Sequence, residues 1–163
     1  GTYGIGYQFG MIMLVVQSSI SKAWMPKIIE NINNNHPNKI NNDILRISIF
    51  LFLIFCVVSI TSFLFITKLL SPNYKEAAMV SVLICFAYFI DGIWKLFNGV
   101  LIYYNHYKLS TLILLCAGFT NVLLNLFLIP NYGIFGASTS TLISFLIGLL
   151  LSIYITKFRI KHI

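Results

Sequence analysis

Long apolar stretches alternate with short polar segments along the whole chain. Residues 1–21 and 47–67 carry no formal charge, and residues 109–156 form a further uncharged run of 48. About 20 apolar residues are enough for a helix to cross the hydrocarbon core of a bilayer. The pattern predicts five membrane-spanning helices, over residues 4–24, 45–67, 78–103, 108–129 and 134–156.

The polar segments contain residues that end helices or form turns. In the longest, residues 25–44, the part from Pro26 to Ile32 is expected to lie along the membrane surface as an amphipathic helix, followed by a turn at NNNHPN. Pro130 is expected to end the fourth helix and Gly133 to allow a tight reversal. The uncharged run of 48 residues would thereby fold into two antiparallel helices.

Composition agrees with a lipid-embedded chain. Of the 163 residues, 58% are hydrophobic and only 9% charged, with a mean hydropathy of +0.88. Soluble domains carry about 25% charged residues, because their surfaces face water. We therefore expect an all-α, polytopic transmembrane bundle in which residues 1–163 form a single domain.

The net charge of +7 indicates a membrane orientation rather than nucleic-acid binding, because no basic stripe with interleaved aromatic residues lies outside the apolar runs. Cytoplasmic loops are enriched in Lys and Arg. The five-helix topology gives Lys68 and Lys75 to one side. It gives eight basic residues to the other: Lys22, Lys27, Lys39, Arg46, Lys108, Lys157, Arg159 and Lys161. Loop 25–44 and the C-terminus are therefore expected in the cytoplasm.

This topology places Gly1 on the external side, directly before a span and without an initiator Met or a basic signal region. The chain is therefore expected to be the C-terminal part of a longer protein.

Two formal charges, Asp91 and Lys95, lie deep in the third predicted span and four residues apart, so they share a helix face. Each charge at the bilayer centre costs about 2.5–3.5 kcal/mol on insertion scales, so such residues usually face a cavity or a partner. Tyr88, Asn98 and Asn105 extend the same face into a polar stripe. The stripe either lines a translocation cavity or is built around a structural ion pair.

Other polar residues in the spans have two interpretations as well. Asn121 and Asn125 are four residues apart and can either join neighbouring helices or contact a substrate. Gln17 could reach the cavity, whereas Lys22 is expected to extend to the lipid headgroups. A stripe of small residues in the last span predicts close helix packing: Gly136, Ser140, Ser144, Gly148 and Ser152.

Enzymatic chemistry is not expected. The sequence has no paired acidic motif, no His–carboxylate set, no Gly-rich phosphate loop and no nucleophile–base spacing. Cys56, Cys85 and Cys116 are far apart inside apolar runs, and the three histidines are isolated. We expect no metal and no cofactor.

Three segments resemble a known family. NVLLNLFLIPNYGIFGASTSTLISF (residues 121–145) resembles a recurring segment of the polysaccharide flippases in the multidrug/oligosaccharidyl-lipid/polysaccharide exporter superfamily. YFIDGIWKLFNGVLIYYNHYKLS (residues 88–110) is similar to the preceding helix of the O-antigen branch. GTYGIGYQFG with SKAWMPKIIE resembles the start of the second helix of that family's C-terminal lobe.

The resemblance implies most of the C-terminal lobe of a two-lobe, alternating-access transporter in the bacterial inner membrane. Its substrate would be an undecaprenyl-pyrophosphate-linked oligosaccharide for O-antigen, lipopolysaccharide or capsule biosynthesis. Lys95 would attract the pyrophosphate. The N-terminal lobe of the same chain, membrane lipid, a polysaccharide polymerase and assembly proteins are the expected partners. A cation-coupled multidrug exporter of the same superfamily and a membrane-embedded glycan polymerase or transferase remain alternatives.

Overall fold

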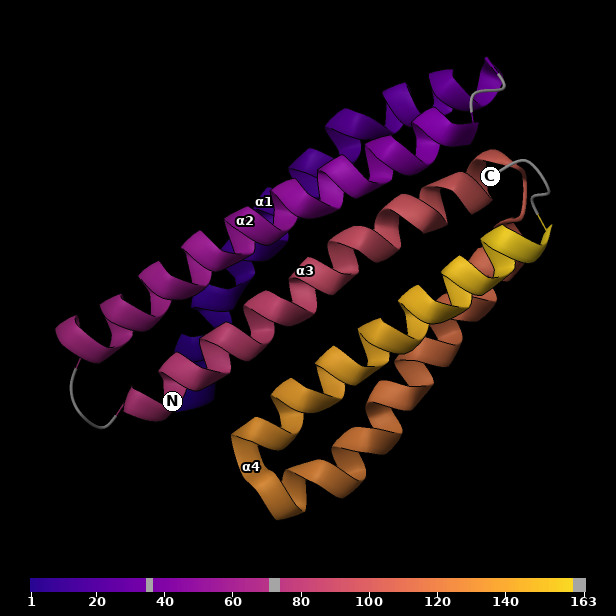
Figure 1. The fold of residues 1–163 in the computed structure, drawn as a ribbon. Helices are drawn as coiled ribbons and strands as arrows, with labels where there is room; N and C mark the ends of the chain where they lie inside the picture. Colours follow the sequence, from indigo (N-terminus) through magenta and orange to yellow (C-terminus); the bar gives the residue numbers. More distant parts are fainter. Residues whose placement is uncertain (35–36, 71–73, 160–163) are drawn as a thin grey trace.

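A computed structural model describes residues 1–34, 37–70 and 74–159, and these residues fold into four α-helices (Figure 1). The helices are α1 (Thr2–Asn33), α2 (Pro37–Leu69), α3 (Lys75–Tyr103) and α4 (Tyr107–Arg159). No strand occurs in these three segments, so the all-α prediction is confirmed.

Three helices of the described chain are long and apolar enough to cross a membrane: Lys39–Leu69, Lys75–Tyr103 and Tyr107–Phe158. Large apolar side chains are exposed on the outside of the bundle, among them Val57 and Phe119, with exposed fractions of 62% and 66%. Such a surface is unusual for a soluble monomer. The architecture is therefore compatible with a membrane protein. The helix α1 is not one of the three, because Gln8, Gln17 and several glycines lower its hydropathy.

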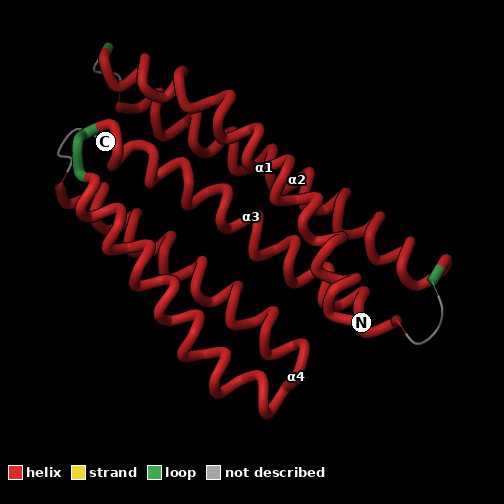
Figure 2. The backbone as a smooth tube through the Cα atoms, turned by 180° about the vertical axis from the view of Figure 1, so that it is seen from behind, coloured by secondary structure: helices red, strands yellow, loops and turns green. Residues whose placement is uncertain are grey.

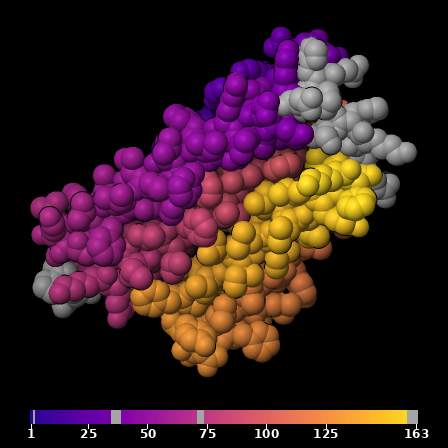
Figure 3. Space-filling view, in the orientation of Figure 1, coloured from indigo at the N-terminus to yellow at the C-terminus, as the bar shows by residue number. Residues whose placement is uncertain are grey.

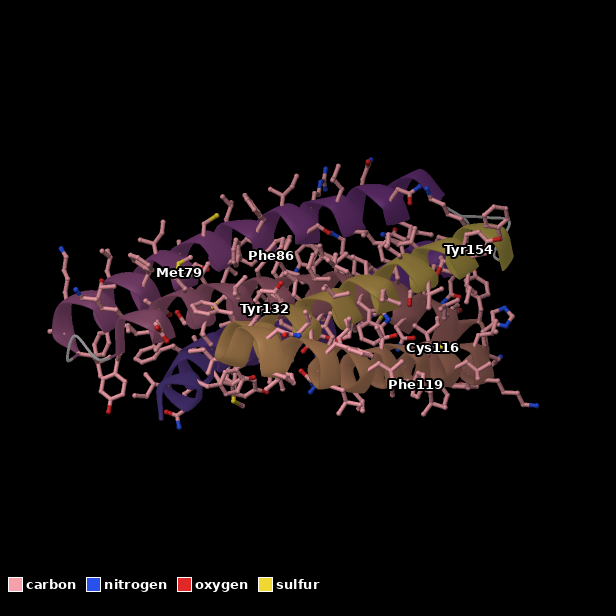
Figure 4. The ribbon with its side chains drawn as sticks, turned by 90° about the horizontal axis from the view of Figure 1, so that it is seen from below. Met79, Phe86, Cys116, Phe119, Tyr132 and Tyr154 are labelled. Atoms are coloured by element: carbon pink, nitrogen blue, oxygen red, sulfur yellow. The ribbon has the colours of Figure 1, made fainter. Side chains whose placement is uncertain are left out.

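The helix α4 folds back on itself at Gly133, where φ is 55° and ψ is −128° (Figure 2). Glycine adopts this backbone conformation without the Cβ clash that other residues meet. Residues 107–132, the first arm, and residues 134–159, the second arm, run antiparallel. Pro130, predicted to end a helix, lies inside the first arm instead, and the helical geometry breaks at Gly133. Tyr132 lies at this reversal (Figure 4).

The predicted loop 25–44 is mostly helical. The helix α1 continues through Pro26 to Asn33, and α2 begins at Pro37. The reason is an apolar contact between the two helices. Ile28 and Ile32 of α1 are buried in the same core as Ile40 and Ile44 of α2, which composition alone did not reveal. The two helices therefore extend beyond the predicted spans as a packed hairpin. Part of the predicted NNNHPN turn, residues 35–36, lies outside the described residues.

The helix α3 is the centre of the bundle and contacts each of the other three helices. On the face shown in Figure 3 it lies between α2 and the second arm of α4. Four phenylalanines pack between α2 and α3, with ring centroids 5.4–6.0 Å apart: Phe52, Phe55, Phe86 and Phe89. Against α1, the packing is close because Gly6 and Gly10 have no side chains there. A Cβ at Gly6 would lie 2.7 Å from the Ala77 carbonyl oxygen.

Both ends of the bundle collect helix termini (Figure 1). One end of the bundle holds five helix termini: the end of α1, the start of α2, the end of α3 and both ends of α4. We call this end the basic end, because it holds Lys27, Lys39, Arg46, Lys108 and Lys157, whereas Lys68 and Lys75 lie at the other end. The arrangement agrees with the charge separation expected from the sequence.

Candidate functional site

An ion pair lies between α1 and α3. The Lys95 Nζ is 2.6 Å from Asp91 Oδ2, one helical turn away along α3. The Gln17 amide of α1 donates a second hydrogen bond, of 2.9 Å, to the same Asp91 oxygen. The two charged side chains differ in exposure, since that of Asp91 is 9% exposed and that of Lys95 is 42% exposed. The carboxylate is therefore held inside the bundle, while the ammonium reaches an open space.

That space is a pocket of about 480 Å³ between α1 and α3. We call it the two-lysine pocket, and it is lined by Ser18, Ser21, Lys22, Met25, Lys95, Asn98 and Ile102. No acidic side chain lines it. The buried Oδ1 of Asn98 has no hydrogen-bond partner among the described residues. The walls of the pocket are mostly apolar, and Lys22 and Lys95 place two positively charged side chains on them, which suits an anionic ligand that also has an apolar part.

Of the predicted site residues, the structure brings Lys95 and Asn98 to this pocket. Gln17, Tyr88 and Asp91 do not line the pocket and lie in the α1–α3 interface, where the Tyr88 hydroxyl hydrogen-bonds to that of Tyr7 at 2.8 Å. The polar stripe of the sequence thus divides into a buried network and a pocket-lining part. Asn105 does not continue the stripe, because it follows the end of α3 in a turn with a φ of 61°.

Asn121 and Asn125 lie elsewhere and join the two arms of α4. The Asn121 amide donates to Ser144 Oγ at 3.3 Å, and the Asn125 amide donates to Asn121 Oδ1 at 3.0 Å. The Ser140 hydroxyl donates to Asn125 Oδ1. This geometry is that of interhelical bridges.

Asn121 also borders a separate, smaller pocket of about 260 Å³ beside Trp94 and Phe145. That pocket shares no residue with the two-lysine pocket, so Asn121 and Asn125 are not brought together with Lys95.

The small residues of the second arm pack closely. Ser140, Ser144 and Ser152 are buried, and a Cβ at Gly148 would lie 2.8 Å from the Trp94 ring. The close approach predicted from their four-residue spacing is therefore confirmed for this arm.

Sequence reasoning missed the contribution of Lys22, which it assigned to the lipid headgroups. In the structure Lys22 lines the pocket with Lys95. Ser18, Lys22 and Met25 are spaced four and three residues apart, which places them on one helical face. Combining that face of α1 with the polar stripe of α3 would have indicated the second lysine.

The described residues contain no group of three or more His, Cys, Asp or Glu side chains that could hold a metal ion. Cys56, Cys85 and Cys116 are all free thiols. No known protein family, curated protein or solved structure matches the chain. The function is therefore argued from the geometry of the two-lysine pocket.

Proposed function

We propose that this chain is the C-terminal part of an inner-membrane flippase that moves a lipid-linked oligosaccharide precursor to the outer leaflet. The precursor would serve O-antigen, lipopolysaccharide or capsule biosynthesis. The five membrane spans of this proposal are α1, α2, α3 and the two arms of α4. The basic end faces the cytoplasm, in accordance with the excess of Lys and Arg there.

The observation that carries the proposal is the two-lysine pocket. A lipid-linked pyrophosphate brings two adjacent anionic groups to the membrane, and the pocket offers two ammonium groups, Lys22 and Lys95. Lysine is a compact point charge with three donors and can follow a phosphate as its orientation changes. The amide of Asn98 supplies a further hydrogen bond to a phosphate or sugar oxygen.

Asp91 positions Lys95 within this mechanism. Its buried carboxylate, also bound by Gln17, holds the ammonium one helical turn away at the pocket wall. The contact pairs the Lys95 ammonium at membrane depth, where an unpaired charge is costly. During alternating access, the pocket would open first to the cytoplasm and then to the outside, and the pyrophosphate would remain bound to the two lysines.

The cation-coupled drug exporter is less well supported by this geometry. An exporter of cations needs a carboxylate that is available to its substrate. Asp91, the acidic residue that lies in the middle of a described helix and not near a helix end, already accepts hydrogen bonds from Lys95 and Gln17. A transporter of an anionic substrate fits the pocket better, and no arrangement of described residues favours a polymerase or transferase.

The proposal is tested by an export assay on the full-length protein in cells that lack their own copy. Lys95→Gln should abolish surface glycan to a greater extent than any fall in its abundance on immunoblots explains, and Lys22→Gln should reduce export. Lys95→Arg should keep partial activity, because it retains the charge and changes the geometry. Lys108→Gln is the matched control, since Lys108 is exposed at the basic end outside the pocket. Normal export by Lys95→Gln would overturn the proposal.

A further inference from the structure

A second polar pocket lies at the basic end, between the last turns of α1 and the first turns of α2. Its volume is about 360 Å³, and it is lined by Lys27, Asn31, Lys39, Asn42, Asp43 and Arg46. We call it the hairpin pocket. It shares no residue with the two-lysine pocket, so it is a separate site.

The hairpin pocket has more basic than acidic residues. Its acidic residue, Asp43, is buried and already engaged, because Oδ2 accepts a hydrogen bond of 2.7 Å from Asn31 and Oδ1 lies 3.7 Å from Lys27 Nζ. Lys27 is also held 4.7 Å over the ring of Trp24. Lys39 and Arg46 are exposed and form no ion pair with the described part of the chain. Two positive charges are therefore available to an anion.

The depth of the pocket matches that of lipid phosphates. The uncharged runs end at Ser21 in α1 and begin at Ile47 in α2. With a helical rise of about 1.5 Å per residue, Arg46 lies about 2 Å, Lys27 about 9 Å and Lys39 about 12 Å beyond these boundaries. The headgroup layer on each side of a bilayer is roughly 5–8 Å thick, so the pocket overlaps it. This step rests on the membrane placement proposed above.

An apolar surface continues from the pocket toward the membrane core. Ile49, Phe50, Leu53 and Val57 follow Arg46 at intervals of three, four, seven and eleven residues, and each is at least half exposed. The surface therefore combines a cationic pocket at headgroup depth with an exposed apolar stripe below it. A soluble phosphate would use only the first of these features, whereas a phospholipid would use both.

We infer that the hairpin pocket binds the phosphate of an anionic phospholipid, whose acyl chain lies along the apolar stripe of α2. Lys39 and Arg46 contact the headgroup, and Lys27 stays oriented by Asp43 and Trp24. The bound lipid would cover the seam between α1 and α2 where both helices leave the hydrocarbon layer.

Native mass spectrometry of the full-length protein in detergent tests this inference. Phosphatidylglycerol should bind more tightly than phosphatidylcholine. Removing one basic residue near a membrane surface weakens such binding by about fivefold, so Lys39→Gln with Arg46→Gln should weaken it by about 25-fold. The matched control removes two charges from the same end outside the pocket, Lys108→Gln with Lys157→Gln, and should leave the affinity unchanged. Equal affinities for both double variants would overturn the inference.

Two further arms separate charge from folding and lipid from free phosphate. The charge-preserving double variant, Lys39→Arg with Arg46→Lys, should keep its affinity for phosphatidylglycerol. Loss of phosphatidylglycerol binding in this variant would contradict a site based on charge. A large excess of inorganic phosphate should not displace the lipid. Displacement would assign the pocket to a soluble anion instead. Release of the protein from membranes by alkaline carbonate would contradict its placement in the membrane. This result would be independent of the lipid affinities.

Discussion

The Gln17 amide on α1 donates a hydrogen bond of 2.9 Å to the Asp91 carboxylate on α3, linking residues 74 positions apart in the chain. Gln17 is fully buried, and its Oε1 atom has no hydrogen-bond partner in the described structure. A buried amide that keeps one polar atom unpaired is costly, and the charge-assisted bond to Asp91 offsets part of that cost. This contact fixes the carboxylate on which Lys95 depends.

Gln17→Leu should therefore destabilise the protein. Hydrogen bonds to charged groups contribute about 1.5–3 kcal/mol, and the substitution leaves Asp91 with Lys95 as its remaining donor. Thermal unfolding of the purified full-length protein in detergent measures the effect. Ser19→Ala is the control, because the exposed Ser19 hydroxyl bonds to the Val15 carbonyl of its own helix. An unchanged melting temperature in Gln17→Leu would mean that the carboxylate is held without this amide.

Three glycines with different surroundings test the packing of the helices. A Cβ at Gly6 would lie 2.7 Å from the Ala77 carbonyl oxygen and one at Gly148 2.8 Å from the Trp94 ring, whereas a Cβ at Gly118 would meet nothing within 4 Å. Gly6→Ala and Gly148→Ala should each destabilise the protein by about 1–3 kcal/mol through overpacking. Gly118→Ala should stabilise it by up to about 1 kcal/mol, because alanine favours a helix. Equal melting temperatures in all three variants would show that helix spacing is not set by these residues.

The five-span topology predicts opposite sides for Asn34 and Asn131. Both residues lie at helix ends, Asn34 after α1 and Asn131 next to the reversal of α4. In a full-length background lacking Cys56, Cys85 and Cys116, a cysteine at position 34 should react only when an impermeant thiol reagent reaches the cytoplasm. A cysteine at 131 should react from outside intact cells. Labelling of both positions from the same side would contradict the two antiparallel spans of α4.

The sequence predicted the all-α fold, the Asp91–Lys95 spacing and the reversal near Gly133, because each depends on local pattern. The extended α1–α2 hairpin could not be predicted in the same way. The sequence predicted that Pro26–Ile32 lies along the membrane surface as an amphipathic helix, whereas the burial of Ile28 against α2 depends on tertiary packing. The pairing of Lys22 with Lys95 in one pocket likewise required knowing which faces of α1 and α3 meet.

The limits of local pattern are also visible in the polar stripe of α3. The four-residue spacing placed Asp91 and Lys95 on one face, but it could not tell that one side chain is buried and the other is open to a pocket. That difference comes from α1, whose Gln17 covers the carboxylate. Asn98 lines the same pocket as Lys95, because the two residues are three positions apart on α3.

The central claim, that Lys95 binds the substrate and does not merely neutralise Asp91, is tested most directly by Asp91→Asn combined with Lys95→Gln. Removing Lys95 alone leaves the buried Asp91 carboxylate with Gln17 as its donor, whereas removing both charges avoids an uncompensated charge. The double variant should therefore reach near-normal abundance in the membrane. We predict that it nevertheless exports no glycan in cells that depend on it, because the pocket has lost an ammonium group. Full export by a well-expressed double variant would contradict the account and leave the pair a purely structural role.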